Sequence, residues 1–506
     1  MSSEGSKRSG RKARHAQRAA KPVVDPCPPG QKGGAYKPLS QREIEQIYDT
    51  ALRLLERLGM GNVPDRLAAD LKAAGAQAGQ QDRLLFPREM VQRAIDTAPK
   101  SFVLHGRDEN RSIEVGGDRV YFGTGGAAVQ TLDIDSGLYR PSTLADLHDF
   151  TRLQDTLANV SWFTRCCVAT DVPDVFDLDF NTAYALVRNT TKPVATSFTL
   201  AEHVGPIVEM LDIVAGGPGE FAKRPFLKAH ISPVISPLRY GEDAVDVVYE
   251  CVAHNIPMSC ITAAQAGATA PATLAGFLAQ SLAETLASLV MVYAIRPGFP
   301  MVFSNWPFIV DLRTGSFAGG SGETAVLNAA SAQITNWLGL PSGVAASMTD
   351  AKAIDAQYGL EKGMTSLAAA LAGGNLIYES SGMTASLLGA SFEGFVLDNE
   401  MHSHTYRALR GIEVSEENLG FDAICHSVLG DGHFLGSAQT YAAMERDYFY
   451  PELADRQEPH TWQNDGAKDA WSSARHHAKE VLASHHPENL SAEQDAEIRK
   501  RFRILI

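Results

Sequence analysis

The chain has 506 residues, of which 44% are hydrophobic and 21% charged, and its net charge at pH 7 is -14. This composition is typical of a soluble globular protein with a large core, and it argues against both a disordered chain and a membrane protein. The acidic balance gives no support for a nucleic-acid groove.

The N-terminal segment is basic, with the sequence KRSGRKARHAQRAAK from Lys7 to Lys21. A charged segment containing glycine and serine buries too little apolar surface to order itself, so we expect residues 1–37 to be a disordered tail and linker. A nucleic-acid-binding or partner-binding arm and a transit peptide are the alternatives.

Residues 38–117 are expected to form an N-terminal extension of helices and short strands. Its first helix is predicted from Ser40 to Gly59, because Ser40 and Glu43 have the spacing of a capping box and apolar residues follow at helical spacing. A second helix is predicted over 87–97.

From residue 118 to 440, short apolar segments alternate with helical patterns. Strands are predicted at 120–122, 160–168, 193–198, 226–231, 257–262, 300–304, 343–346 and 375–378. Helices are predicted at 144–157, 201–214, 241–254, 273–295, 322–338 and 360–372. Eight strands alternating with helices favour the α/β class and a (β/α)8 TIM barrel, with residues 441–506 as a C-terminal helical extension.

Two further patterns favour a cytoplasmic protein. The longest apolar stretch, 282–295, is interrupted by Glu284 and Thr285, which predicts a buried helix rather than a membrane span. The six cysteines contain no CxxC pair, and the adjacent Cys166 and Cys167 are expected to be buried thiols rather than metal ligands.

The functional face of a TIM barrel lies at the carboxyl ends of its strands. The residues that follow the predicted strands are Trp162, Phe163, Arg165, Phe198, Thr199, His230, Gln265, Trp306, Phe308, Asp311, Arg313, Glu323, Met348 and Glu379. Several are aromatic, and no metal motif, nucleophile elbow or phosphate-binding loop accompanies them, so we predict no metal site.

Structural alternatives apply to several of these residues. His230 can be a core or loop histidine, Glu323 a first-turn helix acid, and Phe198 or Phe308 a packing residue. Histidines 402, 404, 476 and 477 are expected on solvated helical surfaces. Trp306, flanked by Asn305 and Pro307 at a strand exit, is harder to assign to a core. Aromatic residues with a carboxylate or amide favour a pocket for an organic cation.

The ordered segments FVLHGRD, VYFGTGG, ISPLRY, GLPSGVAASMTDAK, LEKGMTSL, NLIYESSGM, GDGHFLGSAQTY and DYFYPELADR resemble the trimethylamine methyltransferase superfamily, from Ser40 to near the C-terminus. The resemblance implies a (β/α) barrel that moves a methyl group from a methylated amine to the cobalt of a separate corrinoid protein. It also implies a homo-oligomer. The acidic balance and the lack of a long uninterrupted apolar run predict neither nucleic acid nor membrane as a partner. Because the resemblance places the corrinoid on that separate protein, no tightly bound cofactor is predicted in this chain.

Name-giving members of that family carry pyrrolysine after a late barrel strand, and the matching residue here is Met348. The resemblance therefore implies a quaternary amine as the donor, such as glycine betaine, proline betaine, carnitine or butyrobetaine, because a quaternary nitrogen already makes its methyl groups electrophilic. The corrinoid, a cobalamin-type group, is expected to be supplied by the partner.

Two groups of site residues are predicted on this basis. Glu323 and Met348 are the predicted catalytic residues. The predicted substrate-binding residues are Tyr121, Trp162, Phe198, Trp306 and Phe308 for the ammonium, and His230, Arg313 and Gln265 for a carboxylate. The alternatives are a barrel that binds a betaine without turnover and a metal-dependent hydrolase or lyase using His230 and Glu323.

Overall fold

The computed structural model describes residues 25–506, so the basic segment 7–21 lies outside the described residues. The chain divides into two compact units. One contains residues 29–409 and 451–506, and the other contains residues 1–28 and 410–450. The first unit, which we call the barrel unit, holds all the predicted site residues. The predicted domain boundaries at 37, 117 and 440 stay predictions.

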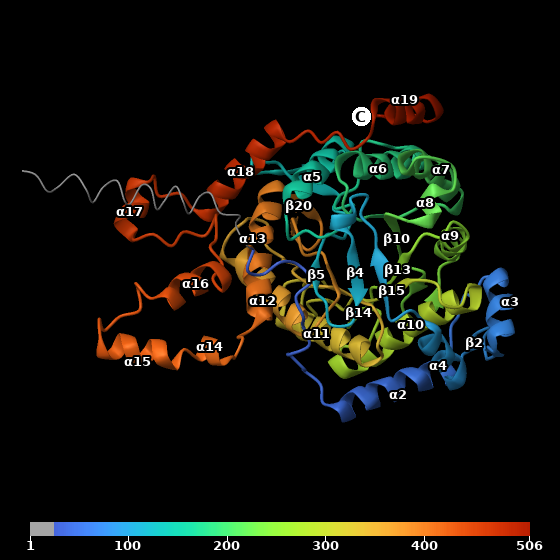
Figure 1. The fold of residues 1–506 in the computed structure, drawn as a ribbon. Coiled ribbons are helices and arrows are strands. Elements are labelled where there is room, and N and C mark those ends of the chain that lie inside the picture. The colour runs from blue at the N-terminus through green and yellow to red at the C-terminus, as the bar shows by residue number, and fades with distance from the viewer. Residues whose placement is uncertain (1–24) are drawn as a thin grey trace, which may run out of the picture. The chain divides into compact units, whose positions relative to one another are not determined.

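Eight parallel strands form the barrel (Figure 1). They are β5 (Tyr121–Phe122), β8 (Phe163–Thr164), β9 (Val194–Thr196), β10 (Leu227–Ile231), β13 (Met258–Thr262), β15 (Met301–Asn305), β17 (Ser342–Ala345) and β18 (Leu376–Tyr378). Their order is β5-β18-β17-β15-β13-β10-β9-β8, and a parallel bridge between Gly123 and Trp162 joins the two ends. The TIM barrel and its eight predicted strands are confirmed.

Helices surround these strands in the alternation that the sequence predicts. They are α5 (Leu144–Thr156), α6 (Val175–Asn189), η2 (Ala201–His203), α7 (Val204–Ala215), α8 (Glu220–Lys223), α9 (Glu242–Ala253), α10 (Leu274–Ile295), α11 (Gly322–Trp337), α12 (Ala356–Leu371) and α13 (Phe392–Arg410). α6 was not predicted, because eleven of its fifteen residues are buried and they leave no polar stripe that marks an amphipathic helix.

α10 is the only helix within residues 25–506 that is long and apolar enough to cross a membrane. Most of its apolar window, 78%, is buried inside the protein, and it packs against the N-terminal helices α2 (Gln41–Arg57), α3 (Asp65–Ala74) and α4 (Arg88–Thr97). The predicted buried helix is confirmed. Ser40 and Glu43 form the predicted capping box at the start of α2.

A hairpin of β3 (Ser101–Leu104) and β4 (Ile113–Gly116) covers the amino-terminal end of the barrel. Leu104, Ile113 and Val115 belong to the same buried cluster as Leu376 of β18. The turn of the hairpin is held by the segments that lead into β9 and β10: the Arg107 amide donates to Thr191, and the Arg224 guanidinium donates to Gly106. That end of the barrel is therefore filled by protein.

The remaining short strands are β1 (Gln77–Ala78), β2 (Leu84–Leu85), β6 (Gln130–Leu132), β7 (Tyr139–Pro141), β11 (Val234–Ile235), β12 (Arg239–Tyr240), β14 (Gln265–Ala266), β16 (Phe308–Ile309), β19 (Met383–Thr384) and β20 (Gly389–Ser391). The 3-10 helix η1 spans Glu109–Arg111, and helices α17 (Pro459–Asn464), α18 (Ala470–Ser484) and α19 (Ala492–Arg501) complete the barrel unit. α18 packs on α5 and α19 packs on α7.

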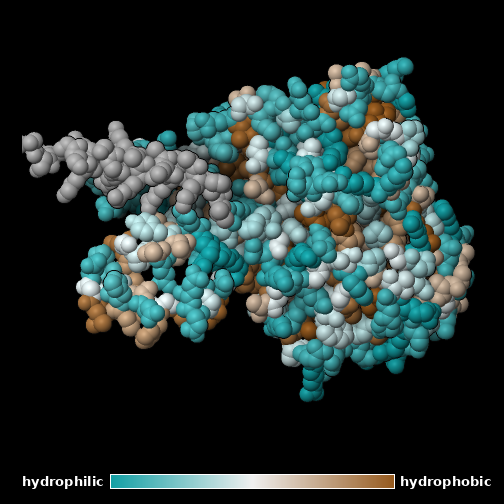
Figure 2. Space-filling model, in the orientation of Figure 1, coloured by the Kyte–Doolittle hydropathy of each residue, from teal (hydrophilic) through white to brown (hydrophobic). Residues whose placement is uncertain are grey.

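Helices α14 (Glu416–Leu419), α15 (Phe421–Leu429) and α16 (Ala438–Arg446) form the second unit, which we call the 410–450 unit. Ser427 is the only buried residue in these three helices. Large apolar side chains are exposed instead, among them Ile412 (90%), Leu429 (88%) and Leu435 (78%), and Figure 2 shows tan and brown residues on these helices. Residues 410–450 therefore have no apolar core of their own.

Two predictions about individual side chains have opposite outcomes. Cys166 and Cys167 are fully buried free thiols, as predicted. The predicted solvated position of His402 is wrong: its ring is buried and stacks on Phe122, with 4.0 Å between the ring centres. α13 passes beside the barrel strand β5 there, so a residue in a polar-looking helix becomes part of the core.

Candidate active site

Aromatic side chains from four different strands meet inside the carboxyl end of the barrel. Tyr378, the last residue of β18, lies at their centre, with ring centres 5.3 Å from Trp162, 5.0 Å from Trp306 and 5.7 Å from His230. The ring of His230 also lies 5.3 Å from that of Trp306. We call these four residues the aromatic cluster.

The position of Tyr378 is fixed by burial and by a hydrogen bond. Its hydroxyl lies 2.6 Å from Ser259 Oγ of β13, across the barrel. Burial raises the pKa of this phenol well above its usual range, so it stays neutral. The ring is therefore a neutral apolar floor beneath Trp306.

The strand extensions β14 and β16 continue the barrel wall beyond its rim. Gln265 pairs with Phe308 in this parallel ladder. The ring of Phe308 lies 6.3 Å from Trp306 and 4.8 Å from Phe317, which it meets edge to face. His230, Gln265, Phe308 and Phe317 are all partly exposed, unlike the buried indoles of Trp162 and Trp306, and we call these four residues the cup.

Met348 lies in the wall beside this cup and is fully buried. A Cβ atom added at Gly319 would lie 3.5 Å from Met348 Sδ and 2.8 Å from the ring of Phe317, so glycine leaves the room in which these two side chains approach each other. Ser347, directly before Met348, has a φ of 63°. The backbone thus turns sharply at Ser347, directly before the Met348 side chain.

The polar residues after Met348 fix this loop. The Thr349 hydroxyl donates to Glu361 of α12 over 2.6 Å, and the Asp350 carboxylate accepts the Gly319 amide at 2.9 Å. Ser386 donates to the same carboxylate at 2.8 Å. Thr349 and Asp350 therefore position the loop and hold two neighbouring loops against it.

Glu379 follows Tyr378 and is fully buried, with no hydrogen-bond partner for either carboxylate oxygen among residues 25–506. A Cβ atom at Gly125 or Gly126 would lie 2.8 Å or 2.6 Å from these oxygens, so the glycine loop after β5 packs directly on the carboxylate. Burial raises the pKa of Glu379 to about 8, and the charge of Lys362 opposes that rise. Glu379 is therefore largely protonated at neutral pH.

The structure brings some of the predicted site residues together. Trp162, His230 and Trp306 lie in the aromatic cluster, Phe308 and Gln265 line the cup above it, and Met348 lies in its wall.

Four predicted residues lie elsewhere. Tyr121 packs on Gly30 near the covered end of the barrel, and Phe198 belongs to the outer core between strands and helices. Glu323 is exposed in the first turn of α11. The Arg313 side chain is 88% exposed and pairs with Asp311 at 2.8 Å. None of these four is in ring contact with the aromatic cluster.

Sequence reasoning missed Tyr378, Phe317 and Lys228 as site residues. The signal for Lys228 was present in FLKAHI, because residues two apart on a strand face the same side, and His230 was already a candidate. Tyr378 carried no such signal, since an aromatic residue at the end of an apolar strand is common in cores.

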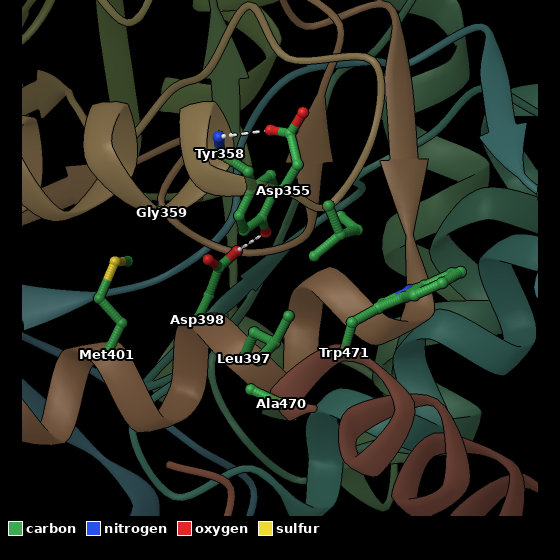
Figure 3. Close-up of a pocket in the computed structure, with 9 residues that line it drawn as sticks. Asp355, Tyr358, Gly359, Leu397, Asp398, Met401, Ala470 and Trp471 are labelled. Atoms are coloured by element: carbon green, nitrogen blue, oxygen red, sulfur yellow. Dashed lines mark hydrogen bonds between the residues drawn. The ribbon is translucent and has the colours of Figure 1, made fainter. Parts of the chain in front are cut away.

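No group of three or more His, Cys, Asp or Glu side chains between residues 25 and 506 is placed to hold a metal ion. A separate cavity of about 290 Å³ lies among α12, α13 and α18, lined by Tyr358, Asp398, Met401 and Trp471 (Figure 3). The Tyr358 hydroxyl donates to Asp398 at 2.9 Å across its wall. None of the predicted site residues lines this cavity.

The sequence profile of the trimethylamine methyltransferase family matches residues 7–503. A glycine betaine methyltransferase from Desulfitobacterium hafniense is 28% identical over 93% of this chain and 97% of its own length. A trimethylamine methyltransferase from the same species is 30% identical over 91% of this chain and 92% of its own length. A trimethylamine methyltransferase from Methanosarcina thermophila is also 30% identical, over 90% of this chain and 94% of its own.

Among solved structures, a dihydropteroate synthase from Coxiella burnetii matches 62% of this chain over its whole length, with 12% identity and a TM-score of 0.38. A dihydropteroate synthase from Xanthomonas albilineans matches 62% of the chain with 14% identity and a TM-score of 0.34.

Proposed function

This chain belongs to the trimethylamine methyltransferase family and is a methyltransferase, and we propose that it takes the methyl group from a quaternary amine. The acceptor in this proposal is the Co(I) of a corrinoid held by a separate partner protein, and the products are the methylated corrinoid and a neutral tertiary amine. The similarity to a glycine betaine methyltransferase supports this donor class.

The observation that carries the proposal is the aromatic cluster beneath the cup. A quaternary ammonium group has no N–H to donate, so proteins hold it by the faces of aromatic rings. Trp306 lies within 6.3 Å of three other rings, those of His230, Tyr378 and Phe308. The site thus offers aromatic surface to a cation at the open end of the barrel.

Met348 supports the same donor class. At the position where the family resemblance places pyrrolysine, this chain has a buried thioether that packs beside Phe317. A thioether forms no adduct with a neutral amine, whereas a quaternary amine needs none, because its own positive charge makes the methyl carbon electrophilic.

The protein's part in this reaction is positioning. The acceptor supplies the nucleophile, and the leaving group departs as a neutral amine, so no side chain has to move a proton. Trp306, Phe308 and Phe317 orient the ammonium with one methyl group toward the opening and exclude water from it. Because the positive charge on nitrogen disappears during transfer, rings that hold the cation too tightly slow the reaction.

The 410–450 unit supports self-association as a further part of the proposal. A helical segment with one buried residue and strongly exposed Ile412, Leu429 and Leu435 gains little from folding alone. The same chain exposes an apolar stripe on α12, made of Leu360, Met364 and Leu367. Apolar surfaces on both units are consistent with copies of this chain covering one another.

A methyl-transfer assay tests the proposed function. The purified protein is mixed with a Co(I) corrinoid protein and with glycine betaine, proline betaine, carnitine, butyrobetaine or trimethylamine, and methyl-Co(III) is followed by absorbance. Methylation from a quaternary amine but not from trimethylamine is the expected result. Methylation from none of them contradicts the proposal and favours a betaine-binding barrel without turnover.

A further inference from the structure

Three lysines are buried in the described chain, and they differ in what surrounds the ammonium. Lys192 Nζ donates to three backbone carbonyls, those of Gln154, Leu157 and Val160, at 2.7–2.8 Å. Lys362 Nζ pairs with Asp398 at 3.1 Å. Lys228 is 2% exposed, and its Nζ has no hydrogen-bond partner within residues 25–506.

An ammonium without partners is costly to bury, because it loses its hydration and gains no hydrogen bond. The Tyr378 ring, whose centre lies 4.8 Å from Lys228 Nζ, offsets only part of that cost. Burial lowers the pKa of Lys228 to about 7, so the side chain is close to losing its proton at neutral pH. The fold provides partners for two buried lysines and leaves the third beneath the site.

The groups around Lys228 are donors as well. His230 lies two residues further along β10 and faces the same side, and its Nδ1 has no partner within the described residues. The indole nitrogens of Trp162 and Trp306, both buried, also lack partners there. All four groups surround the Tyr378 ring at 4.8–5.7 Å.

Basic side chains gather at the same place, and they weaken one another's hold on protons. The pKa of His230 is depressed well below its usual range by burial first, and then by the charges of Lys228 and Arg165. Arg165 Nε has no partner either, and Asp179, the carboxylate that acts on Arg165, already accepts bonds from Thr199 and His203. Glu379 is paired electrostatically with Lys362 rather than with Lys228.

The strand register places Lys228 deeper in the barrel than His230 and Trp306. His230 pairs with Ser259, and Ser259 pairs with Val302, so His230 is level with Val302, four residues before Trp306. Lys228 lies two residues deeper still. His230 is partly exposed, and the buried Lys228 lies two residues before it on the same strand, toward the covered end of the barrel.

We propose that His230 and Lys228, with the charge of Arg165 and the indole N–H groups of Trp162 and Trp306, form a subsite for a carboxylate of the methyl donor. The donor is then a betaine, a zwitterion whose carboxylate points into the barrel and whose trimethylammonium group points toward its opening. The inference rests on the proposed function and narrows its substrate class. Choline and trimethylamine, which have no carboxylate, leave the subsite unfilled.

The test compares glycine betaine with choline, which has the same ammonium group and a hydroxymethyl group in place of the carboxylate. Binding is measured by calorimetry, without an acceptor protein, so that it does not depend on turnover. A hydrogen-bonded charge pair is worth about tenfold or more in affinity. We expect wild-type protein to bind glycine betaine at least about tenfold more tightly than choline, and Lys228→Met to remove that preference.

Lys192→Met is the matched control, since Lys192 is also a buried lysine of the barrel unit but has three carbonyl partners. We expect Lys192→Met to lower the melting temperature and to keep the preference for betaine. Lys228→Met is expected to keep or raise the melting temperature, because it removes an unpaired buried charge. Lys192→Met is thus expected to change stability but not selectivity, and Lys228→Met is expected to remove selectivity without lowering stability.

Proton uptake gives a second readout that a structural role of Lys228 does not produce. A carboxylate beside an amine whose pKa is about 7 favours its protonated form. Glycine betaine binding at pH 8, measured in buffers of different ionisation enthalpy, is expected to take up a proton in wild-type protein and not in Lys228→Met. Acetate is expected to bind weakly and to compete with betaine.

The inference is overturned if choline binds as tightly as glycine betaine, if Lys228→Met keeps the preference for betaine, or if acetate binds without competing. Arg165→Met is a second variant, expected to weaken betaine binding and to leave choline binding unchanged. Betaine binding by Arg165→Met that equals betaine binding by wild-type protein also counts against the subsite. Methyl transfer from choline and betaine alike leaves the proposed function standing and removes the subsite. Betaine binding with the expected selectivity but without methyl transfer leaves the carboxylate subsite standing and contradicts the proposed function.

Discussion

Lys228 Nζ lies 4.8 Å from the centre of the Tyr378 ring, and the two residues come from β10 and β18, on opposite sides of the barrel. The Tyr378 ring therefore reaches across the interior and lies among Lys228, Trp162, His230 and Trp306. The ring is held by Ser259, whose hydroxyl lies 2.6 Å from that of Tyr378.

Trp306→Leu is expected to raise the KM for the quaternary amine about 2- to 30-fold, the range that corresponds to a cation–π contribution of roughly 0.5–2 kcal/mol. Steady-state methyl transfer measures this. Trp337→Leu is the control, because Trp337 packs on Tyr48 at the surface, with ring centres 5.3 Å apart. Equal KM values for the two variants count against Trp306 as a cation-binding residue.

Met348→Leu is expected to keep methyl transfer within a few-fold, because the side chain fills the wall and a branched aliphatic of similar volume does the same at a cost below about 1.5 kcal/mol. Met348→Ala is expected to lower the free energy of unfolding by about 2–5 kcal/mol through the cavity it leaves. Denaturant unfolding measures the second effect. Loss of transfer in a stable Met348→Leu variant indicates a chemical role for the sulfur.

Glu379→Gln is expected to change how stability depends on pH. The pKa of Glu379 is about 8 in the folded chain, and its ordinary value is 4.5. Between pH 4.5 and pH 8, Glu379 therefore keeps its proton in the folded state and loses it in the unfolded state. The free energy of unfolding therefore falls as the pH rises from 4.5 to 8. The variant lacks this loss, so its stability relative to wild type is expected to be higher at pH 8 than at pH 5. The same difference in unfolding free energy between Glu379→Gln and wild type at pH 5 and pH 8 contradicts the raised pKa of Glu379.

Arg313→Gln and Glu323→Gln are expected to leave kcat and KM within about twofold of wild type, since exposed substitutions away from a site change little. Arg313 is exposed and held by Asp311, and Glu323 lies exposed in the first turn of α11. A tenfold fall in kcat/KM for either variant returns that residue to the site as the sequence predicted it.

Leu429→Glu combined with Leu435→Glu is expected to shift the protein to a smaller species in light scattering, because both side chains are strongly exposed in the 410–450 unit. The control is Leu138→Glu, a strongly exposed leucine of the barrel unit. An unchanged mass for the double variant contradicts self-association through this unit.

The barrel could be predicted from the sequence because strand and helix periodicities alternate over its whole length. The eight strands matched because each is a short apolar run bounded by turn residues. α6 was missed because a helix buried on most sides has no amphipathic stripe. His402 was misjudged because its burial depends on Phe122, which is 280 residues away in the chain.

The site was predictable only in part. Strand ends identified Trp162, His230 and Trp306, since the carboxyl face of a barrel collects whatever follows its strands. The sequence could not distinguish Arg313 from Lys228 as the cation for a carboxylate. Arg313 has Asp311 two residues away, which was visible, but the absence of a partner for Lys228 depends on residues from several distant strands.

The hairpin of β3 and β4 has a kinetic consequence. Because it fills the amino-terminal end of the barrel, the amine and the acceptor protein of the proposed reaction have only the opening at the other end in which to meet. For that reaction we expect the amine to bind before the acceptor, and the demethylated product to leave after the acceptor has gone. With this order of binding, a high concentration of acceptor protein is expected to inhibit methyl transfer, and the inhibition is expected to be stronger at low concentrations of amine.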